Sequence, residues 1–232
     1  MATRRFKKGF TLIELTLVMA FMSILMLSIL YMTIHAGKLY TKGLTNKSMN
    51  QVGREVFDVM KRDIASADSS QVVRKDELGS GDLKSGRFCT GTISYVWNTA
   101  PLLNSPVSQK IKSNGAPVTF RRVIDPAGSL CQESGVSGLY PMNISSLQST
   151  ELLSNDGRSF AIYTMEIKAV ASDNAKNGLY SVKMVLGTNE PSTTTKNATQ
   201  GFQCEPPTAE TANFDYCTVA EFYTILRTGG EI

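Results

Sequence analysis

The feature of this 232-residue chain that most restricts its fold is a run of 20 residues without any charge, from Leu15 to Ile34. As an α-helix this run would be about 30 Å long, which is the thickness of the hydrocarbon core of a bilayer. The apolar part of a cleaved secretory signal is shorter, typically about 7 to about 15 residues. The run therefore predicts a membrane helix that the mature protein keeps.

Charge predicts how this helix is oriented. The first nine residues include four basic side chains and no acidic one, namely Arg4, Arg5, Lys7 and Lys8. Since basic residues mark the cytoplasmic side of a membrane helix, we expect the N-terminus in the cytoplasm and residues 35–232 outside it. Residues 10–232 hold 20 basic and 20 acidic side chains, so the net charge of +4 comes from the first nine residues. The outer part therefore has no excess of basic charge that would support nucleic-acid binding.

Helical periodicity continues beyond the uncharged run. Apolar residues recur at spacings of three and four, at Met49, Val52, Val56, Val59, Met60, Ile64 and Ala67. The first 100 residues contain no proline, so an unbroken helix from Phe10 to Ala67 would be about 87 Å long. Its second half is amphipathic and needs a surface to pack against.

Alternating apolar and polar residues then predict strands. We expect five of them, at 92–97, 117–124, 160–171, 178–187 and 219–227. Gly79, Gly81 and Gly86 indicate a loop before the first strand, and the Asn177-Gly178 turn predicts that 160–171 and 178–187 form a hairpin. The expected fold is α+β, with the amphipathic half of the helix on one face of a mostly antiparallel sheet and Trp97 in the core.

Four cysteines, Cys89, Cys131, Cys204 and Cys217, lie in the part expected outside the cytoplasm. No CxxC pair occurs and His35 is the only histidine, so zinc-binding spacing is absent. An even number of cysteines in an exported domain suggests disulfides, and three pairings are possible. We favour Cys89–Cys131 and Cys204–Cys217 because each joins sequence neighbours, and four buried reduced thiols are the alternative.

Glu14 is a carboxylate at the start of the apolar stretch, where a charge costs about 2.5 to about 3.5 kcal/mol on insertion scales. One interpretation is a tolerated polar residue near the membrane interface. The other is a functional group with a partner. If the chain is cut after Gly9, Phe10 gains a free α-amine, and the amine of a neighbouring copy could pair with Glu14.

The stretch "KKGFTLIEL" with the apolar run behind it resembles the leader junction of type IV prepilins and pseudopilins, which carry a class III signal peptide. The resemblance implies cleavage between Gly9 and Phe10 by a prepilin peptidase and methylation of the Phe10 amine. It implies that Glu14 pairs with the N-terminus of an adjacent subunit, and that the chain has the pilin fold.

Within that family, residues 53–68 and the late strand 219–227 resemble PilW-type minor pilins and J-type minor pseudopilins of type II secretion. Many major pilins have a proline midway through the membrane segment, where this chain has Tyr31. This departure favours a minor subunit.

The leading hypothesis is therefore a structural subunit of a type IV pilus-like filament. Its parts would be a leader (1–9), a membrane and filament-core helix (10–34), an amphipathic helix (35–68) and a β-rich extracytoplasmic head (69–232). The expected partners are other pilin or pseudopilin subunits, the prepilin peptidase and an inner-membrane assembly platform. The expected location is the inner membrane, and a surface filament after assembly.

Two other classes of function compete with this hypothesis. A membrane-tethered module that binds DNA, a surface or a secreted substrate is the alternative, and Arg121 with Arg122 is the only basic pair on the expected strands that suggests it. An enzyme is disfavoured for two reasons. His35 is the only histidine and lies far from the head, so the head cannot hold a catalytic triad. No phosphate-binding GxxxxGK[ST] loop occurs. We expect no catalytic residue, no cofactor and no metal site.

Overall fold

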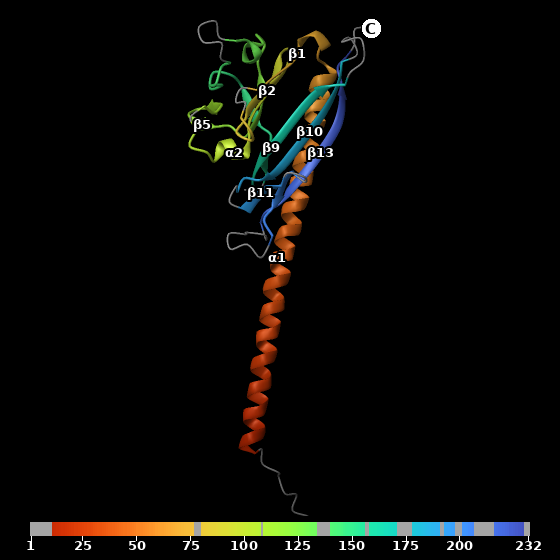
Figure 1. Ribbon diagram of the computed structural model, residues 1–232. Coiled ribbons are helices and arrows are strands. Elements are labelled where there is room, and N and C mark those ends of the chain that lie inside the picture. Colours follow the sequence, from red (N-terminus) through yellow and green to blue (C-terminus); the bar gives the residue numbers. More distant parts are fainter. Residues whose placement is uncertain are drawn as a thin grey trace, which may run out of the picture.

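The computed structural model has an α+β layout, in which one long helix carries a β-rich head near its C-terminal end (Figure 1). It describes residues 11–76, 80–107, 109–133, 140–155, 158–170, 178–190, 193–197, 201–206 and 216–229. Gly9 and Phe10 lie outside the described residues, as does the whole leader 1–9.

Helix α1 spans Leu12–Ala65 and is continuous over 54 residues. Thr11 caps its N-terminus, because the Thr11 side chain and the Glu14 side chain each bond the backbone N–H of the other. The helix ends at Ala65, two residues before the predicted end at Ala67, and Ser66 caps its C-terminus. A short 3-10 helix, η1 (Ser69–Gln71), then turns the chain into the head.

Two larger antiparallel sheets form the head. The first has the strand order β1 (Val72–Asp76), β2 (Ser85–Thr90), β3 (Ile93–Asn98), β6 (Phe120–Ile124) and β7 (Ser149–Glu151). The second has the order β13 (Val219–Arg227), β10 (Leu179–Thr188), β9 (Arg158–Ala169) and β8 (Ser154–Asn155).

Smaller elements complete the head. They are helix α2 (Ala100–Leu103), the 3-10 helix η2 (Ser129–Cys131), and the strand pairs β4 (Lys112–Ser113) with β5 (Ala116–Pro117) and β11 (Thr194–Asn197) with β12 (Gly201–Cys204). The β11–β12 hairpin lies between the fourth and fifth predicted strands, in a stretch for which the sequence predicted no strand.

The five predicted strands are present as β3, β6, β9, β10 and β13, and β9 pairs with β10 as predicted. The expectation of one sheet is wrong, because β1 and β2 were not predicted and build a second sheet with β3, β6 and β7. Gly86 indicated a loop but lies in β2 opposite Trp97. A Cβ on Gly86 would lie 2.3 Å from the Trp97 ring, so this glycine permits close packing within a strand.

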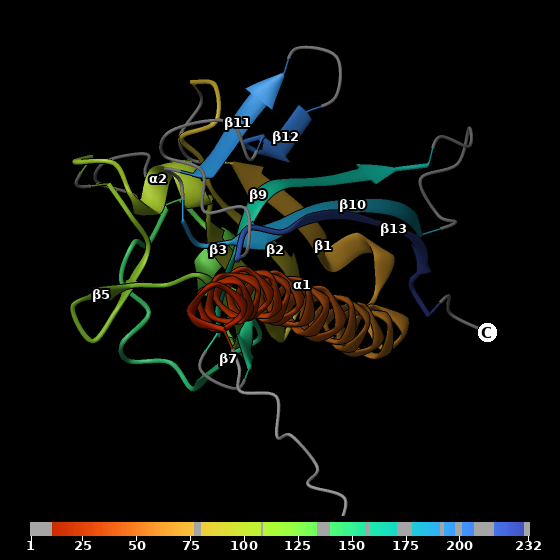
Figure 2. The same cartoon turned by 90° about the horizontal axis from the view of Figure 1, so that it is seen from below.

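Helix α1 and both larger sheets share one hydrophobic core. The helix contributes Met49, Val52, Val56, Met60 and Ile64, all of which are buried. In the view from below, α1 lies along one face of the sheet of β9, β10 and β13 (Figure 2). The closest packing is between Gly53 and Phe222, since a Cβ on Gly53 would lie 2.4 Å from the Phe222 ring.

Strand β3 is buried on both faces, so the expectation of a half-buried strand at 92–97 is wrong. Tyr95 and Trp97 face the main core, as predicted for Trp97. Val96 faces a second core, built with residues from the segment that follows β3: Ile111, Val118, Val123, Leu130 and Ile144. This segment covers the face that would otherwise meet water, which alternation within β3 alone did not indicate.

Candidate functional site

The exposed half of α1 is the first candidate site. Every residue from 11 to 40 is exposed, and the first buried residue of the helix is Thr45. Among the described residues, α1 is the one helix long and apolar enough to cross a membrane, judged by its length and composition. A single element therefore carries an unburied apolar surface at one end and the core of the head at the other.

Glu14 lies at the free end of this helix and bonds to its own chain. Its Oε2 atom accepts the Thr11 backbone N–H at 3.0 Å and the Thr11 hydroxyl at 2.8 Å. In return the Glu14 backbone N–H donates to the Thr11 hydroxyl oxygen at 3.3 Å. Both side-chain bonds end on one oxygen, and within the described chain no group donates to the other, Oε1. The carboxylate thus has room for a donor from outside the chain.

A polar cluster fixes the other end of α1 to the head. Asp63 accepts N–H groups of Arg122 at 2.6 and 3.0 Å and also accepts the hydroxyl of Tyr95. Hydrogen bonding to Asp63 raises the pKa of Arg122, so its charge is secure. Burial raises the pKa of Tyr95, and the bond to Asp63 raises it further. These partners come from α1, β6 and β3, and they join the helix to the five-stranded sheet.

The basic pair Arg121 and Arg122 does not form a binding patch. Arg122 is engaged by Asp63, and Arg121 pairs with Glu151 of β7 at 3.1 Å. Arg121 also donates to Ser149 at 3.0 Å. Arg122 therefore joins the helix to the sheet and Arg121 joins β6 to β7, and neither supports the tethered binding module that the sequence left open.

The structure contains the disulfides Cys89–Cys131 and Cys204–Cys217, the two pairings favoured from the sequence. The first lies beside the second core and links β2 to η2. The second joins the end of β12 to the segment that leads into β13, so it holds the β11–β12 hairpin against the four-stranded sheet. No described cysteine is free.

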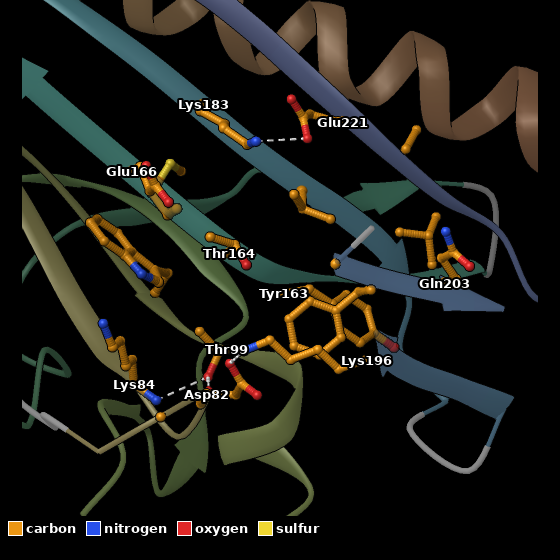
Figure 3. A pocket seen from close by; sticks show the side chains of 18 of the residues that line it. Asp82, Lys84, Thr99, Tyr163, Thr164, Glu166, Lys183, Lys196, Gln203 and Glu221 are labelled. Carbon is orange, nitrogen blue, oxygen red and sulfur yellow. Dashed lines mark hydrogen bonds and ion pairs between the residues drawn. The ribbon is translucent and has the colours of Figure 1, made fainter. Parts of the chain in front are cut away.

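A groove in the head is the second candidate site, and the sequence did not predict it. It has a volume of about 720 Å³ and lies over the outer face of the four-stranded sheet, between the β11–β12 hairpin and the chain around Lys84 (Figure 3). Most of its charged groups come from elements far apart in the chain, namely Asp82, Lys84, Glu166, Lys183, Lys196 and Glu221. No local motif connects them, so no sequence pattern indicated this site.

Side chains that commonly bind metals are not clustered in the part of the chain that the structure describes. Among the residues that the structure describes, no group of three or more His, Cys, Asp or Glu side chains could hold an ion. His35, the only histidine, stacks on Tyr31 one turn earlier in the exposed part of α1.

In comparisons with known proteins, no family model, curated protein or solved structure matched this chain. Its function is therefore inferred from the geometry and chemistry of the described residues.

Proposed function

We propose that this protein is a structural subunit of a type IV pilus-like filament, anchored in the inner membrane before assembly and built on the pilin fold. The observation that carries this proposal is the division of α1 into two halves. Residues 11–40 are exposed and apolar, whereas Met49 to Ile64 supply the core of the head. A helix that spans a membrane in one state can pack against identical helices in another, because both environments bury the same apolar surface.

Glu14 sets the register between neighbouring helices in such a bundle. An uncompensated carboxylate among apolar helices is unfavourable, so a subunit gains stability when a cation from its neighbour reaches Glu14. The proposed cation is the α-amine of Phe10, released by cleavage after Gly9. The open Oε1 atom of Glu14 supports this role, because the bonds from Thr11 occupy only Oε2.

The filament would be a pilus or a type II secretion pseudopilus, with this chain as a minor subunit. The absence of proline from residues 12–34 supports a minor role. The partners would be other pilin or pseudopilin subunits, a prepilin peptidase and an inner-membrane assembly platform. The head would face outward, and no catalytic step is assigned to it.

Two measurements test this proposal. The intact mass of the full chain, purified from membranes of its native cells, should show loss of residues 1–9 and gain of one methyl group. Glu14→Gln should insert and fold normally but enter sheared filaments far less than the wild type. Glu55→Gln is the matched control, since Glu55 is an exposed carboxylate of the same helix outside the apolar run.

Two results would overturn the proposal. An uncut chain would show that Gly9–Phe10 is not a processing site and would favour a membrane-tethered binding module. Normal entry of Glu14→Gln into filaments would remove the assembly role of the carboxylate.

A further inference from the structure

We propose that the groove over the four-stranded sheet binds an extended, acidic segment of another polypeptide, with Lys84 and Lys183 as its main charge contacts. This inference does not rest on the filament role, because the groove lies on the head, away from the exposed half of α1 (Figures 1 and 3).

The floor of the groove is formed by paired strands of the four-stranded sheet. Thr164, Val185 and Glu221 lie in one row across β9, β10 and β13, because Val185 is the register partner of both others. Glu166 and Lys183 form the next row. The floor is thus held by three paired strands, so it needs little reorganisation when a ligand binds.

Charge on this surface favours an anionic ligand. Lys183 pairs with Glu221 at 2.9 Å, and Lys196 pairs with Asp82. Lys84 lines the groove as well, and among the described residues its ammonium group has no ion pair. An acidic ligand that crosses the groove would therefore meet one uncompensated cation at Lys84 and, at Lys183, one whose partner is exposed to solvent.

Basic side chains surround the carboxylate of Glu166 on this surface. Lys168, Lys183 and the Arg74 guanidinium together lower the pKa of Glu166, with the hydrogen bond from Lys168 as the largest cause. Arg74 itself is fixed by the carbonyl oxygens of Met165 and Ile167, at 3.0 and 3.1 Å, so its charge stays at the edge of β9.

The size and lining of the groove favour a peptide over a sugar or a nucleic acid. Three strands span about 10 Å, the length of about three extended residues. Trp97 and Tyr163 are buried, and Lys196 covers the ring of Phe202 at 5.3 Å. No aromatic face on the described lining is therefore open for the stacking that sugars and bases use. Backbone and acidic side chains of a peptide match the half-buried hydroxyl, amide and ammonium groups of Thr164, Gln203 and Lys183.

Fluorescence anisotropy with the full chain in a non-ionic detergent tests the inference. The probe is a fluorescein-labelled pentapeptide, Gly-Glu-Ser-Asp-Gly, and the matched neutral peptide is Gly-Gln-Ser-Asn-Gly. We expect the acidic probe to bind about tenfold more tightly than the neutral one, and Lys84→Gln to weaken its binding about fivefold. Glu166→Gln should strengthen it, because that variant removes a negative charge from the floor.

Lys61→Gln is the matched control, since Lys61 is an exposed lysine of α1 remote from the groove, and it should bind as the wild type does. Fluorescence of Trp97 and the mass of the non-reduced chain with two disulfides show that each variant is folded. Equal binding of both peptides, equal binding by wild type and Lys84→Gln, or weaker binding by Glu166→Gln would overturn the proposal. Tighter binding of a labelled uronic-acid oligosaccharide than of the acidic peptide would also overturn it.

Discussion

Asp63 and Arg122 form a two-point ion pair between the last turns of α1 and strand β6, with N–H···O distances of 2.6 and 3.0 Å. Their side chains are 12% and 26% exposed, so water screens this pair only in part. Tyr95 donates a third hydrogen bond to the same carboxylate. The pair joins the helix to the five-stranded sheet, whereas Phe222 joins it to the four-stranded sheet.

Replacement of Asp63 should therefore destabilise the head. Asp63→Ala leaves Arg122 and Tyr95 without their acceptor, and we expect a loss of about 2 to about 3 kcal/mol in the free energy of unfolding. Urea unfolding followed by the fluorescence of Trp97, the only tryptophan and a buried one, measures this loss. Asp58→Ala is the control, because Asp58 is exposed, and it should change the free energy by less than about 0.5 kcal/mol. Equal values for both variants would contradict the role of the ion pair.

Tyr95 should make the stability of the head sensitive to alkaline pH. Burial and the bond to Asp63 raise the pKa of Tyr95 above its ordinary value of 10.0. A raised pKa contributes stability that is complete below pH 10 and is lost as the pH rises toward the folded-state pKa, by about 1.4 kcal/mol per pH unit.

Tyr95→Phe tests this dependence. At neutral pH the variant should be less stable than the wild type by about 1 kcal/mol, because Asp63 loses a donor. Above pH 10 the gap should shrink, since only the wild type loses stability through this hydroxyl. Urea unfolding of both proteins between pH 7 and pH 11 measures the gap. The buried hydroxyl of Tyr163 is present in both proteins and cancels, so parallel curves would show that Tyr95 is not the group responsible.

Gly53 and Gly43 should respond to alanine in opposite directions. In an open helix alanine is more favourable than glycine by about 0.5 to about 1 kcal/mol, and a Cβ on Gly43 would meet nothing within 4 Å. A Cβ on Gly53 would lie 2.4 Å from the Phe222 ring, so the ring or the helix must shift. We expect Gly43→Ala to stabilise and Gly53→Ala to destabilise by about 1 to about 3 kcal/mol in thermal or urea unfolding. Recovery of stability when Phe222→Leu is added would show that the ring is the obstacle.

The head should fold without the exposed half of α1. Removal of residues 1–34 deletes no buried residue that the structure describes, so the free energy of unfolding should stay within about 0.5 kcal/mol and the protein should dissolve without detergent. Removal of residues 1–56 deletes Met49, Val52 and Val56 from the core, each worth about 2 kcal/mol or more, and should abolish cooperative unfolding. Loss of folding in the shorter deletion would mean that the exposed half stabilises the head.

Sequence reasoning was most accurate where structure depends on one segment. The predicted strand 219–227 is β13 itself, and β9 buries Met165 and Ile167 in the main core as their alternation predicted. The same alternation was wrong for Tyr163, which packs in a separate cluster with Val185 and Phe202, and for Ala169, which is exposed. Sequence reasoning was also wrong at β3, where a second core covers the outer face, and at Gly86, whose neighbour Trp97 explains the glycine. Both errors arise because a residue's partner across the sheet is not visible in its own segment.

The sequence by itself determined the long helix, its apolar and amphipathic halves and five strands, because periodicity within one segment specifies them. It also indicated the two disulfides through the proximity of their cysteines. Only the tertiary structure decided that the strands divide between two larger sheets, that Asp63 meets Arg122 across 59 positions, and that Lys196 meets Asp82 across 114 to form the groove. Such contacts depend on how whole elements pack, since the core must be filled from both sheets and the helix together.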